Sequence, residues 1–327
     1  MIKTRLTDKF EIDHPILCAP MALICGGALA AAVTQAGGLG IMGGGYAGTI
    51  GEGDILEQQY RLAGNTPIGV GFITWAAESN PQAVDWAIAK RPKCLFLSFG
   101  TPRNFATKAV EAGVPVISQV QTMAHAREAL DAGASVIVAQ GAEAGGHGAR
   151  RSTLPFVPEV ADLLAKSYPD VLLLAAGGIA DGRGLAASLM LGADGVVVGS
   201  RFWAAEEALT PPAAVAKAAA ADGDQTVRTT ALDSLRGVPW PAEFSFRVMR
   251  NRLTDEWAHR EKEASAEFGA MKQSYNEARL RGDLDVVATI AGEAVGLIHQ
   301  RLPAADIISG MVTEAEAALG RGARLVS

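Results

Sequence analysis

The sequence is poor in cysteine, in excess positive charge and in long apolar runs, and each shortage excludes a class of protein. Its three cysteines, Cys18, Cys25 and Cys94, lack metal-ligand spacing, so we expect no metal site and no disulfide, as in a reducing cytoplasm. The formal net charge of −6 argues against nucleic acid or an anionic membrane surface as a partner. No apolar run approaches the roughly 20 residues that cross a bilayer, and the N-terminus MIKTRLTDKF has no signal core. We therefore expect a cytoplasmic protein that binds small molecules.

The 327 residues do contain short apolar runs that alternate with alanine-rich segments of helical spacing. The eight predicted strands are residues 16–19, 39–42, 68–72, 94–98, 116–120, 136–139, 171–175 and 196–198. The predicted helices between them lie near residues 27–36, 52–63, 81–90, 103–112, 122–132, 156–167 and 183–191. Such alternation requires parallel strands, and eight units in about 200 residues match an α/β fold of the (β/α)₈ TIM-barrel type. A doubly wound open sheet is the alternative.

The pattern changes after Trp203. Residues 204–300 contain no predicted strand, and their long charged amphipathic stretches predict an inserted α-helical lobe after the eighth strand. The last segment, AADIISGMVTEAEAALGRG, is predicted to return as the eighth outer helix. We therefore expect a barrel domain of residues 1–210 plus 301–327, and a lobe of residues 211–300 above the carboxyl ends of the strands.

Residues 172–202 carry the strongest local signal, because two predicted strands there each run into glycines. Loops after strands seven and eight of a barrel commonly bind phosphate, since glycines let backbone N–H groups approach an anion. The four residues that fit such a site are Gly177, Gly178, Gly199 and Ser200. Asp181 can cap the next helix, and Arg201 can pair with phosphate or with a barrel carboxylate. Alternatively, these glycines serve only to make tight turns and bind no ligand.

Two other glycine-rich segments are less informative. GGLGIMG, residues 37–43, has the G-x-G-x-x-G spacing of a dinucleotide site, but its glycines surround a predicted strand instead of following one. In CAPMALICGG, residues 18–27, the first strand ends at Ala19, Pro20 and Met21. Proline is common at the end of a strand, so a structural role is at least as well supported here as a role in a site.

His147 stands in the loop EAGGHG after the sixth predicted strand, on the same side as the glycine loops. A neutral imidazole there can accept a proton near neutral pH, although a lone histidine is more often structural. The other histidines, His14, His125, His259 and His299, are interpreted as surface or packing residues. The sequence has no metal-binding cluster of histidines and carboxylates and no G-x-S-x-G elbow, so hydrolysis by metal or by serine is not expected.

The motifs APM, GVGF, SQVQT, AQGAEAGGHG, AAGGIADGRG and GSRF occur in this order over roughly residues 10–205. Together they resemble the nitronate monooxygenases, formerly called 2-nitropropane dioxygenases. The resemblance implies an FMN-containing barrel that oxidises alkyl nitronates with O₂ to carbonyl compounds and nitrite. GVGFITW departs from the family, because Gly71 and Phe72 stand where close members often carry asparagine.

The resemblance also implies a role for each matching position. His147 is the implied base, and Gly177, Gly178, Gly199 and Ser200 are implied to hold the FMN phosphate. The implied contacts of the flavin ring or ribityl chain are Ala19, Pro20, Met21, Gln119, Gln140 and Gly145.

Other functions remain open at this point. The nearest is an NAD(P)H-dependent flavin reductase, acting on quinones or enoyl thioesters, with the same barrel and similar glycine motifs. Another is a cofactor-free phosphate-binding barrel. The expected partners are a small substrate, an alkyl nitronate, together with O₂, and the chain can form a homo-oligomer. Trp75, Trp203 and Phe246 are candidates to contact substrate because they are large apolar residues near predicted mouth segments.

Overall fold

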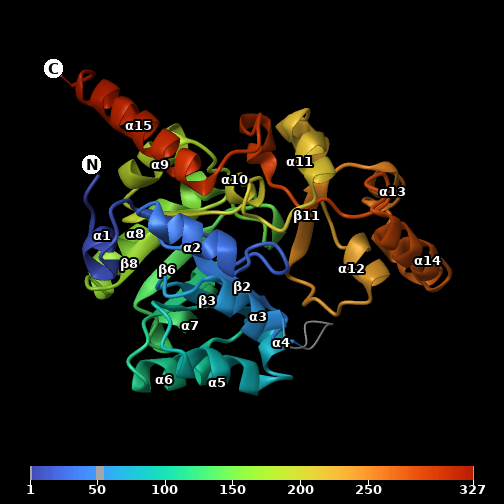
Figure 1. Cartoon of the computed structure of the whole chain (residues 1–327), viewed down its shortest axis with the longest axis horizontal. Coiled ribbons are helices and arrows are strands. Elements are labelled where there is room, and N and C mark those ends of the chain that lie inside the picture. The colour runs from blue at the N-terminus through green and yellow to red at the C-terminus, as the bar shows by residue number, and fades with distance from the viewer. Residues whose placement is uncertain (1, 49–54, 327) are drawn as a thin grey trace.

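The computed structural model describes residues 2–48 and 55–326, and its centre is an eight-stranded parallel sheet (Figure 1). The strands are β1 (Ile16–Cys18), β2 (Ile41–Gly45), β3 (Gly69–Ile73), β4 (Leu95–Ser98), β5 (Val116–Val120), β6 (Val136–Gln140), β8 (Leu172–Ala176) and β9 (Gly195–Val198). Their order is β1-β9-β8-β6-β5-β4-β3-β2. Leu39, just before β2, donates its N–H to Ile16 O at 3.1 Å and accepts from Cys18 N at 3.0 Å. The first and last strands therefore meet, which confirms the barrel and excludes the open sheet.

Both faces of the barrel strands are buried, as their continuous apolar runs predict. Leu17, Phe96 and Ile117 belong to the cluster that fills the interior, whereas Ile16 and Leu95 belong to the cluster between the strands and the surrounding helices. This alternation follows from the two-residue period of a strand, which sends neighbouring side chains to opposite faces.

The surrounding helices agree with the predicted segments. They are α2 (Gly27–Gln35), α3 (Ile55–Leu62), α5 (Pro81–Ala89), α6 (Arg103–Glu111), α7 (Met123–Asp131), α8 (Thr153–Ser167), α9 (Gly182–Met190) and α15 (Ala304–Ala323). The predicted start near residue 52 lies outside the described residues. α15 packs between α9 and α2, which confirms the final segment as the eighth outer helix. A Cβ on Gly182 would lie 2.3 Å from Ala315 N, so the close contact of α9 with α15 requires glycine.

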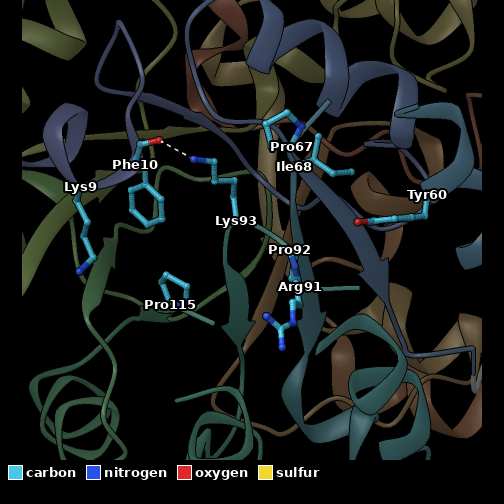
Figure 2. Close-up of a pocket in the computed structure, with 9 residues that line it drawn as sticks. All are labelled: Lys9, Phe10, Tyr60, Pro67, Ile68, Arg91, Pro92, Lys93 and Pro115. Atoms are coloured by element: carbon cyan, nitrogen blue, oxygen red, sulfur yellow. Dashed lines mark hydrogen bonds between the residues drawn. The ribbon is translucent and has the colours of Figure 1, made fainter. Parts of the chain in front are cut away.

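The amino-terminal end of the barrel is covered by α1 (Arg5–Phe10), whose Leu6 and Phe10 join the interior cluster. Figure 2 shows a pocket of about 360 Å³ between α1 and residues that precede β3, β4 and β5. Lys93 crosses it and donates from Nζ to Phe10 O at 3.4 Å. Because this pocket lies at the end away from the glycine loops, we place no chemistry there.

The segment after β9 contains strands as well as helices, so the prediction of a strand-free lobe is wrong. Its elements include α10 (Ser200–Trp203), α11 (Pro212–Ala219), β10 (Thr226–Thr229), α12 (Ala231–Arg236), β11 (Ser245–Met249), α13 (Arg252–Trp257) and α14 (Glu261–Arg281). In Figure 1 the yellow to orange elements of this segment lie together beside the barrel, away from both chain ends. We call residues 204–300 the inserted segment.

β10 and β11 pair with β7 (Gly146–Gly148), which belongs to the loop after β6, to form a three-stranded antiparallel sheet. β7 has two glycines and one histidine, and β10 and β11 are short and contain arginine. The composition of β7 is not typical of a strand, whereas β10 and β11 carry threonine, valine and phenylalanine, so β7 becomes a strand through a contact distant in sequence.

The two ends of the inserted segment lie side by side, because Ala205 bridges to Leu302 and Glu206 N donates to Leu302 O at 2.9 Å. The domain boundaries at residues 210 and 300 stay a prediction. Among the described residues, no helix is long and apolar enough to span a bilayer, and no group of histidine, cysteine, aspartate and glutamate is arranged to hold a metal ion.

Candidate active site

We call the glycine loops after β8 and β9, with Gly177, Gly178, Gly199 and Ser200, the glycine cradle. Gly177 and Gly178 adopt φ values of +99° and +74°, which glycine tolerates best. A Cβ on Gly199 would have no neighbour nearer than Ala19 Cβ at 3.8 Å, so this backbone surface is open. Asp181 caps α9 by accepting from Arg183 N at 2.9 Å and from Gly184 N at 3.1 Å, as predicted.

Ser200, after β9, and Gly145, in the loop after β6, both contact Gly292 of the inserted segment. Ser200 Oγ accepts from Gly292 N at 2.9 Å, which leaves the hydroxyl proton to donate elsewhere. A Cβ on Gly145 would lie 2.6 Å from Gly292 N, so only glycine allows this close backbone contact. Arg201 Nη1 donates to the main-chain oxygen of Gln300 at 3.0 Å, and within residues 2–48 and 55–326 it pairs with no carboxylate, so a contact with phosphate stays a prediction.

The segment Ala19–Met21 lies on the ends of β2 and β3. A Cβ on Gly71 would be 2.5 Å from Pro20 Cβ, and a Cβ on Gly43 would be 2.5 Å from Met21 O. Both strand glycines are therefore needed for the close approach of this loop. Gly71, where the chain departs from the family pattern, provides the space that Pro20 occupies.

The structure brings Gln119 and Gln140 together at the carboxyl ends of β5 and β6. Gln140 Oε1 accepts from Gln119 Nε2 at 3.0 Å and from Gln121 Nε2 at 2.8 Å. Gln140 Nε2 donates to His147 O at 3.2 Å, so the amide network also holds the backbone of β7. Sequence reasoning missed Gln121, although its spacing of two from Gln119 in SQVQT places both on one face of an extended chain.

His147 is buried, with 7% of its surface exposed, and lies opposite Phe246 in the pairing of β7 with β11. Its Nε2 lies 2.9 and 3.0 Å from the two carboxylate oxygens of Asp233 on α12. Its ring is stacked on Trp240, with centroids 3.4 Å apart, and on Phe246, with centroids 4.3 Å apart. Nδ1 forms no hydrogen bond with the described residues and is not fully buried.

Burial lowers the pKa of His147 below its usual 6.5, although the hydrogen bond and charge of Asp233 oppose this effect. Arg236 and Arg228 add to the lowering through their charge. The imidazole is therefore neutral near pH 7. Because a carboxylate only accepts hydrogen bonds, the ring proton is assigned to Nε2, which leaves the lone pair on Nδ1.

Two arginines of the inserted segment hold the loop that carries His147. Arg228 donates to the main-chain oxygens of Ala142 at 3.1 Å, Ala144 at 3.2 Å and Gly148 at 3.0 Å. Arg247 Nε also donates to Ala142 O, at 2.9 Å. Burial, followed by the charge of Arg247, lowers the pKa of Arg228 to about 10. Both side chains remain cationic near neutral pH and fix the loop through charge-assisted hydrogen bonds.

Three aromatic rings contact His147, and three more contact those rings. We call the whole set the aromatic shell: Phe99, Trp240 and Phe246, with Tyr46, Trp75 and Phe244 behind them. Trp240 joins its two sides, because it contacts Trp75 and Phe99 edge-on at 5.4 and 5.0 Å and donates from Nε1 to Tyr46 OH at 3.1 Å. Phe99 has a φ of 62°, a costly conformation for a non-glycine residue that is often found at functional sites.

The aromatic shell contains two of the three apolar residues singled out in the sequence, Trp75 and Phe246. The third, Trp203, packs in a separate cluster with Met249 and Val295. Sequence reasoning missed Trp240, Phe244 and Asp233, because nothing local in their neighbourhood indicates contact with residue 147.

Comparison with known proteins identifies the family of this chain. The family model for nitronate monooxygenase matches residues 3–87 and 74–314. Nitronate monooxygenase npaC of Metarhizium robertsii is 37% identical over 93% of this chain and 91% of its own, and a nitronate monooxygenase of Neurospora crassa is 35% identical over 92% and 89%. Among solved structures, FabK from Thermotoga maritima has a TM-score of 0.80 and 31% identity over 98% of both chains. The chain belongs to the nitronate monooxygenase family.

Proposed function

We propose that this protein binds FMN and oxidises alkyl nitronates with O₂ to carbonyl compounds and nitrite. The observation that carries the proposal is His147, a buried neutral imidazole whose Nδ1 forms no hydrogen bond with the described residues, on the loop after β6 that contacts the glycine cradle. Family membership supports the reaction class. Atoms balance when one O₂ supplies the carbonyl oxygen of two nitronates, each of which releases nitrite.

The residues of the cradle fit an FMN phosphate. The open surface above Gly199, the left-handed backbone of Gly177 and Gly178, and the hydroxyl proton of Ser200 would all favour an anion. The backbone of Ala19–Met21, with Gln119 and Gln140, would lie along the ring or ribityl chain, and Gly145 beside it. When bound, FMN would accept electrons from the nitronate and pass them to O₂.

The chain's own residues orient the substrate and control its protons. Nδ1 of His147 can take the α-proton of a neutral nitroalkane, and the resulting imidazolium can hold the negative nitro oxygens of the nitronate. The aromatic shell offers an apolar surface to an alkyl substituent and limits water near the reacting carbon. The amide network of Gln119 and Gln140 keeps the backbone of His147 in place.

Oxygen uptake by the purified yellow protein with propyl 2-nitronate, without NAD(P)H, tests this proposal. We expect rapid uptake with nitrite formation. With the neutral nitroalkane 2-nitropropane as substrate, whose α-proton must be removed, we expect a loss of about 100-fold or more in the His147→Ala variant. His259→Ala is the matched control, because His259 is exposed, and it should keep wild-type activity. Absence of nitrite formation in the wild-type protein would contradict the proposal.

An NAD(P)H-dependent flavin reductase is the second candidate. FabK from Thermotoga maritima, which is not named a nitronate monooxygenase, is 31% identical over 98% of this chain. Sequence and structural likeness alone therefore do not assign the reaction. The reductase predicts that NADH or NADPH bleaches the flavin under anaerobic conditions and that a nitronate does not. A colourless protein that releases no flavin on heating would instead favour a cofactor-free phosphate-binding barrel.

A further inference from the structure

Asp233 of the inserted segment contacts His147 across 86 positions of sequence. Both residues are buried, with 5% and 7% of their surfaces exposed, and one ring nitrogen meets both carboxylate oxygens at 2.9 and 3.0 Å. Asp233 has a second partner in Arg236, whose Nη1 lies 3.5 Å from Oδ1. Burying an unpaired charge is costly, so the Asp233 carboxylate depends on its contacts with His147 and Arg236.

We propose that Asp233 is the positioning residue of the active site: it holds the proton of His147 on Nε2 and so makes Nδ1 the nitrogen that removes the α-proton of a neutral nitroalkane. This inference rests on the proposed function and assigns the residue that sets which nitrogen of its base carries the proton. It also gives the inserted segment a direct part in the proton transfer.

Stacking fixes the plane of the imidazole, and the contact of Nε2 with Asp233 selects which ring edge faces α12. Trp240 and Phe246 stack on its ring at interplanar angles of 6° and 9°, so rotation out of this plane would break both contacts. Pairing with β11 and the bond from Gln140 to His147 O fix the backbone. With ring and backbone held, the carboxylate decides which nitrogen carries the proton.

The proton transfer balances without a further reactant. The C–H bond of the nitroalkane breaks, its electron pair forms the nitronate, and the proton joins Nδ1. The ring becomes an imidazolium between the nitronate and the Asp233 carboxylate, which stabilises the new positive charge, as the aspartate of a serine protease triad does for its histidine.

A substrate that already lacks the α-proton separates this role from a structural one. Asp233→Asn places an amide opposite Nε2, and its N–H₂ group can donate there and move the ring proton to Nδ1. We expect kcat/KM for a neutral nitroalkane to fall about 100-fold or more, with nitronate oxidation within a few-fold of wild type. Asp255→Asn is the matched control, because Asp255 is an exposed residue of the same segment, and it should leave both substrates unaffected.

Nitrogen NMR of the histidine rings gives a readout that does not depend on turnover. The chain has five histidines, and the His147→Gln variant identifies the signals of residue 147. We expect a neutral ring protonated at Nε2 in the wild-type protein and at Nδ1 in Asp233→Asn. Because the first measurement uses the wild-type chain, it remains decisive if the variant does not fold.

Three results would overturn the role of Asp233: a wild-type ring protonated at Nδ1, an equal loss on both substrates in Asp233→Asn, or a wild-type enzyme that oxidises nitronates but not neutral nitroalkanes. The last of these leaves the proposed function intact. If the wild type oxidises neither substrate, the proposed function fails, and the NMR experiment still decides whether Asp233 sets the proton position.

Discussion

The barrel and the inserted segment contribute differently to the candidate site. The barrel supplies main-chain surface in the glycine loops after β8 and β9 and in the Ala19–Met21 segment. It also supplies the side-chain amides of Gln119 and Gln140. The inserted segment supplies Asp233, Trp240 and Phe246, which contact one ring nitrogen and the ring of His147. His147 itself stands on a barrel loop that joins the sheet of the inserted segment. A barrel that resembles many others can thus acquire its own proton chemistry from what is inserted after its last strand.

The largest effect on stability is expected from a cavity made in the barrel interior. Leu17 is fully buried in β1, so Leu17→Ala should lower the free energy of unfolding by about 2–5 kcal/mol. Leu280→Ala is the matched control, because this leucine of α14 is 83% exposed, and it should change stability by about 0.5 kcal/mol or less. Urea unfolding followed by circular dichroism measures both, and equal effects would contradict the placement of the core.

Filling the cradle should affect cofactor binding without a comparable effect on folding. Gly199 has ordinary negative φ and open space at its Cβ position, so Gly199→Val extends into the proposed phosphate site without backbone strain. We expect FMN affinity to fall about ten-fold or more, from overpacking of about 1–3 kcal/mol. Gly310→Val, in open space on α15, should keep wild-type affinity. Fluorescence titration of the apoprotein measures both, and unchanged affinity for Gly199→Val would place the phosphate elsewhere.

The pH dependence of nitroalkane oxidation tests how the inserted segment changes the pKa of His147, and its expected effect is the smallest of the three. The charged groups that face His147 are Asp233, Arg236 and Arg228, and with burial they leave its pKa lowered from 6.5. A base with a lowered pKa stays neutral as pH falls through 6.5, so kcat/KM for a nitroalkane should stay level there and decline only at lower pH. An acid limb above pH 6.5 would contradict this environment for His147.

Most of the barrel could be predicted from the sequence because its signals are local. A buried parallel strand reads as a short apolar run, and a capped helix starts at a residue such as Asp181, so each element is visible in its own letters. The glycine loops and the place of His147 after the sixth strand followed from the same order of elements.

The sheet of the inserted segment and the partner of His147 could not be predicted in this way. β7 is the tripeptide Gly-His-Gly, and it becomes a strand only because β11 lies beside it, about a hundred residues away in sequence. Asp233 is one of 35 acidic residues, and no spacing distinguishes it. The contact of Arg201 with Gln300 O likewise depends on the return of the chain after the inserted segment.

We propose that a nitronate, without a nicotinamide cofactor, delivers electrons to the flavin that this chain would bind. Anaerobic mixing of the yellow protein with propyl 2-nitronate, followed by absorbance, tests it most directly. We expect the flavin to bleach with the nitronate alone. A flavin that stays oxidised with the nitronate and bleaches only with NADH or NADPH would contradict the account and assign the site to a reductase.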